Sequence, residues 1–149
     1  MVCWESSASV IKQTRLRTYG EYYYLAENGM VYQENSDPIE YLIRLRLWEK
    51  LFGGAPDALG MTAEGQFVSR QKFISGIPPT QQQIDEFLVQ ANLTPVRQDR
   101  WLWKKSYQEE GYEIWVGDAR EDNFVLTPEG VVPIDLRLWF TPSALGTSP

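Results

Sequence analysis

The chain has 149 residues, of which 43% are hydrophobic and 13% aromatic, so we expect a single folded domain rather than a disordered chain. It carries 20 acidic and 14 basic residues, for a formal net charge of -6, and this excess of negative charge disfavours non-specific binding to nucleic acid. The sequence has no histidine and a single cysteine, which excludes histidine-dependent zinc sites, histidine-dependent nucleophiles and a disulfide within the chain.

The first half of the chain predicts a helix, two hairpins and a second, longer helix. We expect residues 1–19 to be helical, because the serines of 6–9 can begin a helix that Gly20 ends. Residues 21–34 predict two strands around an Asn-Gly turn. Residues 38–52 predict a helix with Asp37 as its N-cap and Glu40 closing a capping box. Its expected buried face carries Ile39, Leu42, Ile43, Leu47 and Leu51.

The second half predicts one more helix between further hairpins. Residues 60–76 predict a hairpin that turns at 63–65. Thr80 and Gln83 form a capping-box pattern before a helix that ends near Asn92. Three further segments predict strands: 100–108 and 112–118 as a pair, and 123–140 as a hairpin whose turn is Thr-Pro-Glu-Gly. We expect residues 141–149 to be loose.

One constellation in this sequence suggests chemistry. Asp118 ends an apolar strand, Asn123 follows five positions later, and Asp135 comes after the expected hairpin. Because the hairpin folds back on itself, we expect Asn123 and Asp135 to lie close together at its open end. Oxygen ligands of this kind suit Mg²⁺, and Asp118 is then placed to face an acceptor hydroxyl. From spacing alone, the alternative is that Asp118 is a turn residue and Asn123 only caps its strand.

The same residues carry a resemblance to a known family. The motif Asp-x-Arg-x-x-Asn at 118–123, followed by a hairpin and an Asp, resembles the catalytic loop and metal-binding Asp of the protein-kinase-like superfamily. Residues 20–138 are similar to the kinase domain found in polyvalent proteins of phages and conjugative elements. The resemblance implies a minimal protein-kinase-like α+β fold, with an antiparallel sheet and a few helices. It implies an N-lobe-like part in 20–77 and a much reduced C-terminal lobe in 78–140.

The resemblance also implies roles for single residues, with ATP and Mg²⁺ as cofactors. Asp118 takes the place of the catalytic base and Arg120 that of the cation beside the transferred phosphate. Asn123 and Asp135 take the places of the metal ligands. The remaining implied contacts are with the nucleotide: Gln71 and Phe73 in a hinge over 71–74, Glu49 as the helix glutamate in competition with Glu40, and Gln33 in the place of the nucleotide lysine.

The sequence departs from the family pattern at three places, and because of these departures three hypotheses about its function stay open. Gln33 replaces the lysine, no glycine-rich phosphate loop precedes it, and Leu136 and Arg137 follow Asp135 where protein kinases have Phe and Gly. The first hypothesis is therefore an active phosphotransferase, and the second is an inactive pseudokinase or interaction module. The third is a small α+β protein whose acidic loop is coincidental. We expect a nucleotide as partner, with a protein, a small molecule or a nucleotide as acceptor.

No stretch reaches the about 20 apolar residues that a membrane-spanning helix needs, and the N-terminus lacks the pattern of a signal peptide. Together with the single cysteine, this leads us to expect a cytoplasmic protein without a membrane partner.

Overall fold

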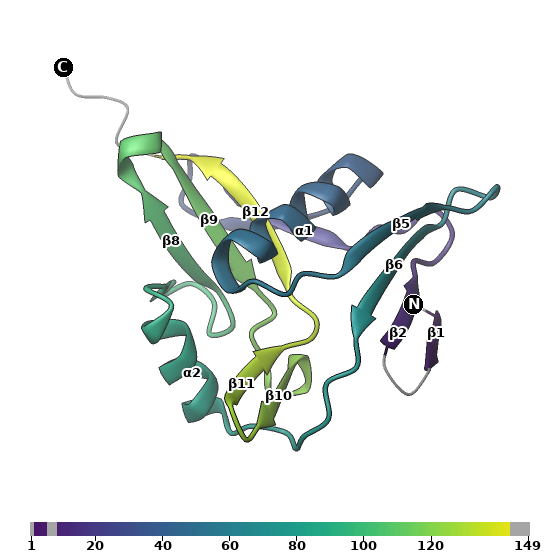
Figure 1. The fold of residues 1–149 in the computed structure, drawn as a ribbon. Coiled ribbons are helices and arrows are strands. Elements are labelled where there is room, and N and C mark those ends of the chain that lie inside the picture. The colour runs from purple at the N-terminus through teal and green to yellow at the C-terminus, as the bar shows by residue number, and fades with distance from the viewer. Residues whose placement is uncertain (1, 6–8, 144–149) are drawn as a thin grey trace. The chain divides into compact units, whose positions relative to one another are not determined.

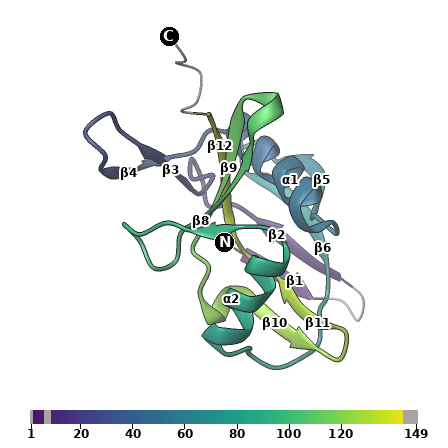
Figure 2. The same ribbon diagram turned by 90° about the vertical axis from the view of Figure 1, so that its left-hand side faces the viewer.

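The structure is a computed structural model that describes residues 2–5 and 9–143. Its chain forms two compact units: unit 1 is Met1–Tyr22 with Gln33–Phe73, and unit 2 is Tyr23–Tyr32 with Ile74–Pro149. The described residues form antiparallel sheets and two α-helices (Figures 1 and 2), which confirms the α+β class. Within them, no helix is long and apolar enough to cross a membrane.

Unit 1 contains a four-stranded antiparallel sheet in the order β1-β2-β6-β5. The strands are β1 (Val2–Glu5), β2 (Ser9–Gln13), β5 (Asp57–Met61) and β6 (Phe67–Lys72). The predicted N-terminal helix is therefore wrong for the described part of residues 1–19, and positions 6–8 lie outside the described residues. The reason is tertiary, since β2 pairs with β1 on one side and with β6 on the other, from Ser9 opposite Lys72 to Gln13 opposite Val68. β-Branched residues at 10 and 11 suit such a strand.

The hairpin of β5 and β6 turns where the sequence predicted. The amide of Thr62 donates to the carbonyl of Gln66 over 2.8 Å, and the amide of Gly65 donates to the carbonyl of Thr62 over 3.0 Å. Gly65 has a φ of +87°, a left-handed conformation that glycine adopts without strain. The predicted Asn-Gly hairpin is also present, as β3 (Glu21–Leu25) paired with β4 (Val31–Asn35).

Helix α1 (Pro38–Phe52) in unit 1 has the predicted capping box. Asp37 Oδ1 accepts from the amide of Glu40, and Glu40 Oε2 accepts from the amide of Asp37, each over 2.7 Å. The predicted buried face is wrong in part, because Ile39 is 67% and Leu42 41% exposed. The helix is apolar around much of its circumference, so periodicity did not fix one face, and the larger aromatic residues are buried instead. The residues of α1 that are buried are Tyr41, Leu45, Leu47 and Trp48.

Unit 2 contains helix α2 (Gln81–Gln90) and a four-stranded antiparallel sheet. The predicted capping box of α2 is present: Thr80 Oγ1 accepts from the amide of Gln83 over 3.2 Å, and Gln83 Oε1 accepts from the amide of Thr80 over 2.9 Å. Ile84 and Leu88 on this helix are fully buried. The sheet has the order β12-β9-β8-β7, with β7 (Thr94–Pro95), β8 (Trp103–Tyr107), β9 (Tyr112–Gly117) and β12 (Arg137–Pro142).

The pairing of β8 with β9 confirms one predicted strand pair, whereas β12 was not predicted as a separate strand. It pairs with β9 along its whole length, so Thr141 and Pro142 belong to the sheet rather than to a loose tail. Positions 144–149 of that expected tail lie outside the described residues. Two 3₁₀ turns, η1 (Gln108–Glu110) and η2 (Glu121–Asn123), follow β8 and β9.

The last predicted hairpin is present as β10 (Phe124–Thr127) and β11 (Gly130–Pro133). Helix α2 lies beside it in unit 2 (Figure 2). One of the divisions between the two units falls between Phe73 and Ile74, and the lobe boundary that the resemblance implies after residue 77 stays a prediction.

Candidate functional site

Asp118 lies in unit 2 directly after β9, in a backbone conformation that few residue types adopt. Its φ is +60°, in the left-handed region where Asp and Asn are enriched among residues with a β-carbon. Its carbonyl oxygen accepts two hydrogen bonds, from the backbone amide of Arg120 over 2.8 Å and from Asn123 Nδ2 over 2.7 Å. These two hydrogen bonds connect the first residue of the loop 118–123 to its third and its last residue.

Asn123 connects this loop to the segment that carries Asp135. Its side chain is buried, and its backbone carbonyl accepts from the amide of Ile134 over 2.9 Å and from the amide of Asp135 over 3.3 Å. The open end of the β10–β11 hairpin therefore places Asn123 and Asp135 side by side, as the hairpin geometry led us to expect. Because Nδ2 is used within the loop, the amide oxygen Oδ1 is the atom of Asn123 that remains to accept or ligate.

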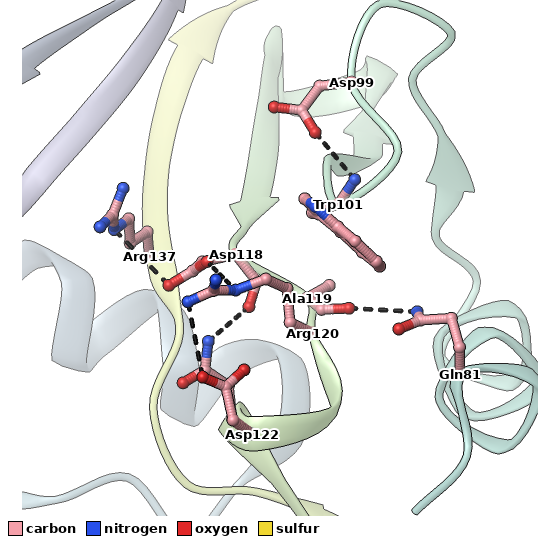
Figure 3. A network of polar contacts seen from close by, with 9 residues as sticks. Gln81, Asp99, Trp101, Asp118, Ala119, Arg120, Asp122 and Arg137 are labelled. Atoms are coloured by element: carbon pink, nitrogen blue, oxygen red, sulfur yellow. Dashed lines mark hydrogen bonds and ion pairs between the residues drawn. The ribbon is translucent and has the colours of Figure 1, made fainter.

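The carboxylate of Asp118 lies between two guanidinium groups (Figure 3). Arg120 Nε is 2.8 Å from Oδ1, and Arg137 Nε is 3.9 Å from Oδ2. Arg120 also approaches Asp122, with Nη2 3.5 Å from Oδ2. Sequence reasoning did not single out Arg137 as a site residue. The missing signal was the pairing of β12 with β9, which sets Arg137 opposite Gly117, the residue before Asp118.

Helix α2 and the residue Trp101 also form hydrogen bonds with the 118–123 loop. Ala119 is fully buried, and its amide donates to the carbonyl of Trp101 over 3.1 Å. Gln81, at the start of α2, donates from Nε2 to the carbonyl of Ala119 over 3.2 Å, and its amide donates to Glu121 Oε1 over 3.1 Å. Backbone and side-chain bonds thus fix the loop to two separate elements of unit 2, which favours a rigid site.

The donor atoms of Asn123 and Asp135 are oxygens, the type of ligand that hard cations prefer. Among the described residues, no three His, Cys, Asp or Glu side chains come together in a metal-binding group. The amide oxygen of Asn123 and the carboxylate of Asp135 are two hard oxygen ligands on neighbouring segments. Mg²⁺ is commonly held by one or two carboxylates together with waters and phosphate oxygens, rather than by an all-protein cage. The donor types of Asn123 and Asp135 are therefore ones that Mg²⁺ accepts when it is bound together with a phosphate ligand.

The other predicted site residues belong to unit 1. Gln33 on β4 is exposed, and Phe73, which follows β6, is 43% exposed. Gln71 is buried on β6, opposite Val10 of β2. Glu49 accepts a hydrogen bond at Oε2 from the amide of Ala55 over 2.9 Å, so its side chain already stabilises the turn that follows α1. Their nucleotide-binding roles stay predictions.

Three comparisons with known proteins, against family models, curated proteins and solved structures, found no match. The chemistry assigned to this chain therefore rests on its own residues and their geometry. The described contacts that bear on a site are those of the 118–123 loop together with Asp135 and Arg137.

Proposed function

We propose that this chain is an ATP- and Mg²⁺-dependent phosphotransferase with a minimal protein-kinase-like fold. The single observation that carries the proposal is the position of Asn123, which is hydrogen-bonded to Asp118 through its side chain and to Asp135 through its backbone. Phosphoryl transfer requires a carboxylate at the acceptor hydroxyl and oxygen ligands at the metal-bound phosphates. The proximity of Asp118, Asn123 and Asp135 within one unit supports the proposal.

In the proposed reaction, Asp118 accepts the proton of the acceptor hydroxyl. The acceptor oxygen forms a bond to the γ-phosphorus, the bond from that phosphorus to the bridging oxygen breaks, and ADP leaves with the electron pair. Asn123 and Asp135 would hold Mg²⁺, which offsets the negative charge of the phosphates. Arg120 lies beside Asp118 and so places a positive charge next to the transferred group.

The second candidate is a pseudokinase or interaction module, and two observations favour it. Position 33, where the resemblance expects the nucleotide lysine, carries an uncharged glutamine. In addition, each oxygen of Asp118 lies within ion-pair distance of an arginine, which gives the carboxylate a structural role in the loop. In this candidate the same contacts stabilise the loop and no phosphate is transferred.

Thermal unfolding tests the nucleotide site. The melting temperature is measured with ATP, with and without Mg²⁺, for the wild type, Asp135→Asn and the control Glu109→Gln, an exposed residue of η1. A ligand at 100 times its dissociation constant stabilises the native state by about 2.7 kcal/mol. We expect a Mg²⁺-dependent rise for the wild type and the control and its loss in Asp135→Asn. No rise in the wild type at millimolar ATP would refute the proposal.

Transfer of the γ-phosphate separates the two candidates. Labelled ATP is incubated with the wild type and with a panel of protein and small-molecule hydroxyl acceptors, and covalently bound phosphate is measured. Transfer that requires Asp118 supports the phosphotransferase. Mg²⁺-dependent binding of ATP without any transfer or hydrolysis supports the pseudokinase.

A further inference from the structure

We infer that Arg137 is a second phosphate-binding cation of this site, acting with Arg120 in place of the missing lysine at position 33. The inference rests on the proposed function, because it assigns the phosphate contacts of the same site. The observation behind it is that two guanidinium groups from different elements approach one carboxylate, at the position where the proposed reaction brings a phosphate.

The pairing of β12 with β9 holds the backbone of Arg137 close to the 118–123 loop. Arg137 begins β12, and its Cα pairs with Gly117, which has no side chain and directly precedes Asp118. Leu136, between Asp135 and Arg137, is 1% exposed and belongs to the core. The side chain of Arg137 is 29% exposed, so a ligand from solvent has access to it. Figure 3 shows it reaching Asp118 from β12, whereas Arg120 reaches Asp118 from within the loop.

The two arginines contact Asp118 in different ways. Arg120 Nε is at hydrogen-bond distance from Oδ1, at 2.8 Å, and holds the carboxylate in place. Arg137 Nε is 3.9 Å from Oδ2, which is close enough for attraction between charges but too far for a hydrogen bond. The contact with Arg120 thus holds Asp118 by a hydrogen bond, whereas the contact with Arg137 is a longer attraction between charges.

A phosphate is a better partner for Arg137 than the carboxylate at that distance. Partly exposed ion pairs contribute little to stability and are screened by salt. A phosphate group carries more charge and accepts two parallel hydrogen bonds from the planar guanidinium. The 118–123 loop together with Asp135 and Arg137 carries four acidic and two basic side chains, so its formal charge is -2 and the two arginines are the groups that can offset the repulsion of a polyphosphate there.

Inorganic tripolyphosphate without Mg²⁺ tests the inference apart from the adenine base and from turnover. Its binding to the full chain is measured by calorimetry for the wild type, Arg137→Gln, Arg137→Lys and the control Arg97→Gln, which removes the same charge from an exposed position of unit 2. We expect Arg137→Gln to weaken binding about tenfold or more. The affinity of Arg137→Lys for tripolyphosphate should lie between those of the wild type and Arg137→Gln, because lysine keeps the charge but cannot make the two parallel hydrogen bonds of a guanidinium. The control should change affinity less than about twofold.

A purely structural role of Arg137 predicts a different result. Arg137→Gln would then lower the melting temperature and leave the affinity for tripolyphosphate unchanged, which would overturn the inference, as would a wild type that does not bind tripolyphosphate. If Arg137→Gln does not fold, Arg137→Met, which keeps a long unbranched side chain without the charge, takes its place, and an affinity equal to that of the wild type again overturns the inference.

The inference and the proposed function fail in distinguishable ways. A Mg²⁺-ATP stabilisation that Arg137→Gln leaves intact keeps the proposed function and overturns the role of Arg137. Tripolyphosphate binding that is lost in Arg137→Gln, in a chain that Mg²⁺-ATP does not stabilise, supports the role of Arg137 and refutes the proposed function.

Discussion

The side-chain amide of Asn123 donates a hydrogen bond to the backbone carbonyl of Asp118, with Nδ2 and the oxygen 2.7 Å apart. Asn123 is only 7% exposed, so water is a poor substitute for this bond. The bond holds Asp118 in its left-handed conformation at the end of β9 and at the same time orients the amide of Asn123. One contact therefore fixes the positions of both the proposed base and a proposed metal ligand.

Removal of this contact should destabilise the chain. In Asn123→Ala, the partly buried carbonyl of Asp118 keeps the amide of Arg120 as a donor but loses its second one. We expect the free energy of unfolding in urea to fall by about 1–3 kcal/mol. The control Gln98→Ala changes an exposed amide of the same unit and should stay within about 0.5 kcal/mol of the wild type. Equal stabilities for the two variants would contradict the role assigned to Asn123.

Asp118→Asn should slow γ-phosphate transfer strongly while leaving the fold intact. Asparagine adopts the left-handed region as aspartate does, so the substitution keeps the backbone at a φ of +60°, whereas alanine there would be strained. The neutral amide cannot accept the acceptor proton, and we expect the rate of γ-phosphate transfer to drop by about 10²- to 10⁴-fold. The melting curve and the Mg²⁺-dependent stabilisation by ATP serve as the controls. A variant that transfers phosphate at the wild-type rate would rule out Asp118 as the base.

Local signals in the sequence were sufficient for much of the fold. Each of these signals is formed by residues that are only a few positions apart in the sequence. They are the capping boxes that begin at Asp37 and Thr80 and the turns at 63–65 and 127–130, and the structure contains all of them. The strand β2 shows the opposite case. Its residues pair with β6, where Ser9 is opposite Lys72, so its conformation depends on a partner far away in the sequence. Serines that can cap a helix did not outweigh that pairing.

In the site, too, contacts between residues close in the sequence were predictable and contacts that depend on distant strand pairing were not. The proximity of Asn123 and Asp135 was predictable, because a short hairpin must bring its two ends together. The approach of Arg137 to Asp118 was not, since it requires β12 to pair with β9 rather than to continue the hairpin. Periodicity alone did not identify which face of α1 is buried.

The face of α1 can be tested with two substitutions of similar size. Leu45 is buried in a cluster with Tyr41 and Phe67, whose rings lie 4.6 Å apart, whereas Ile39 is 67% exposed. Leu45→Ala should lower the free energy of unfolding by about 2–5 kcal/mol, because it removes buried apolar surface and leaves a cavity. Ile39→Ala should change it by less than about 0.5 kcal/mol. If Ile39→Ala lost more free energy of unfolding in urea than Leu45→Ala, the buried face predicted from periodicity would be correct after all.

Gly76 allows the chain before α2 to approach β10 closely. Next to it, Ile77 exchanges two backbone hydrogen bonds with Leu126, of 3.1 and 2.7 Å. A β-carbon on Gly76 would clash with the carbonyl oxygen of Leu126 and lie 2.6 Å from Val125 Cγ1. A clash with a backbone atom cannot be relieved by rotating a side chain, so Gly76→Ala must move the segment away from β10.

We expect Gly76→Ala to lower the free energy of unfolding by about 1–3 kcal/mol, the usual cost of overpacking. Ser75→Ala, at an exposed neighbouring position, is the matched control and should behave like the wild type. The segment leads into α2, whose Gln81 holds the loop at Ala119 and Glu121, so the displacement should also weaken the Mg²⁺-dependent stabilisation by ATP. A variant with wild-type stability in urea would show that the segment does not need this close approach to β10. A stability loss without any change in ATP binding would show instead that the 118–123 loop keeps its geometry without support from α2.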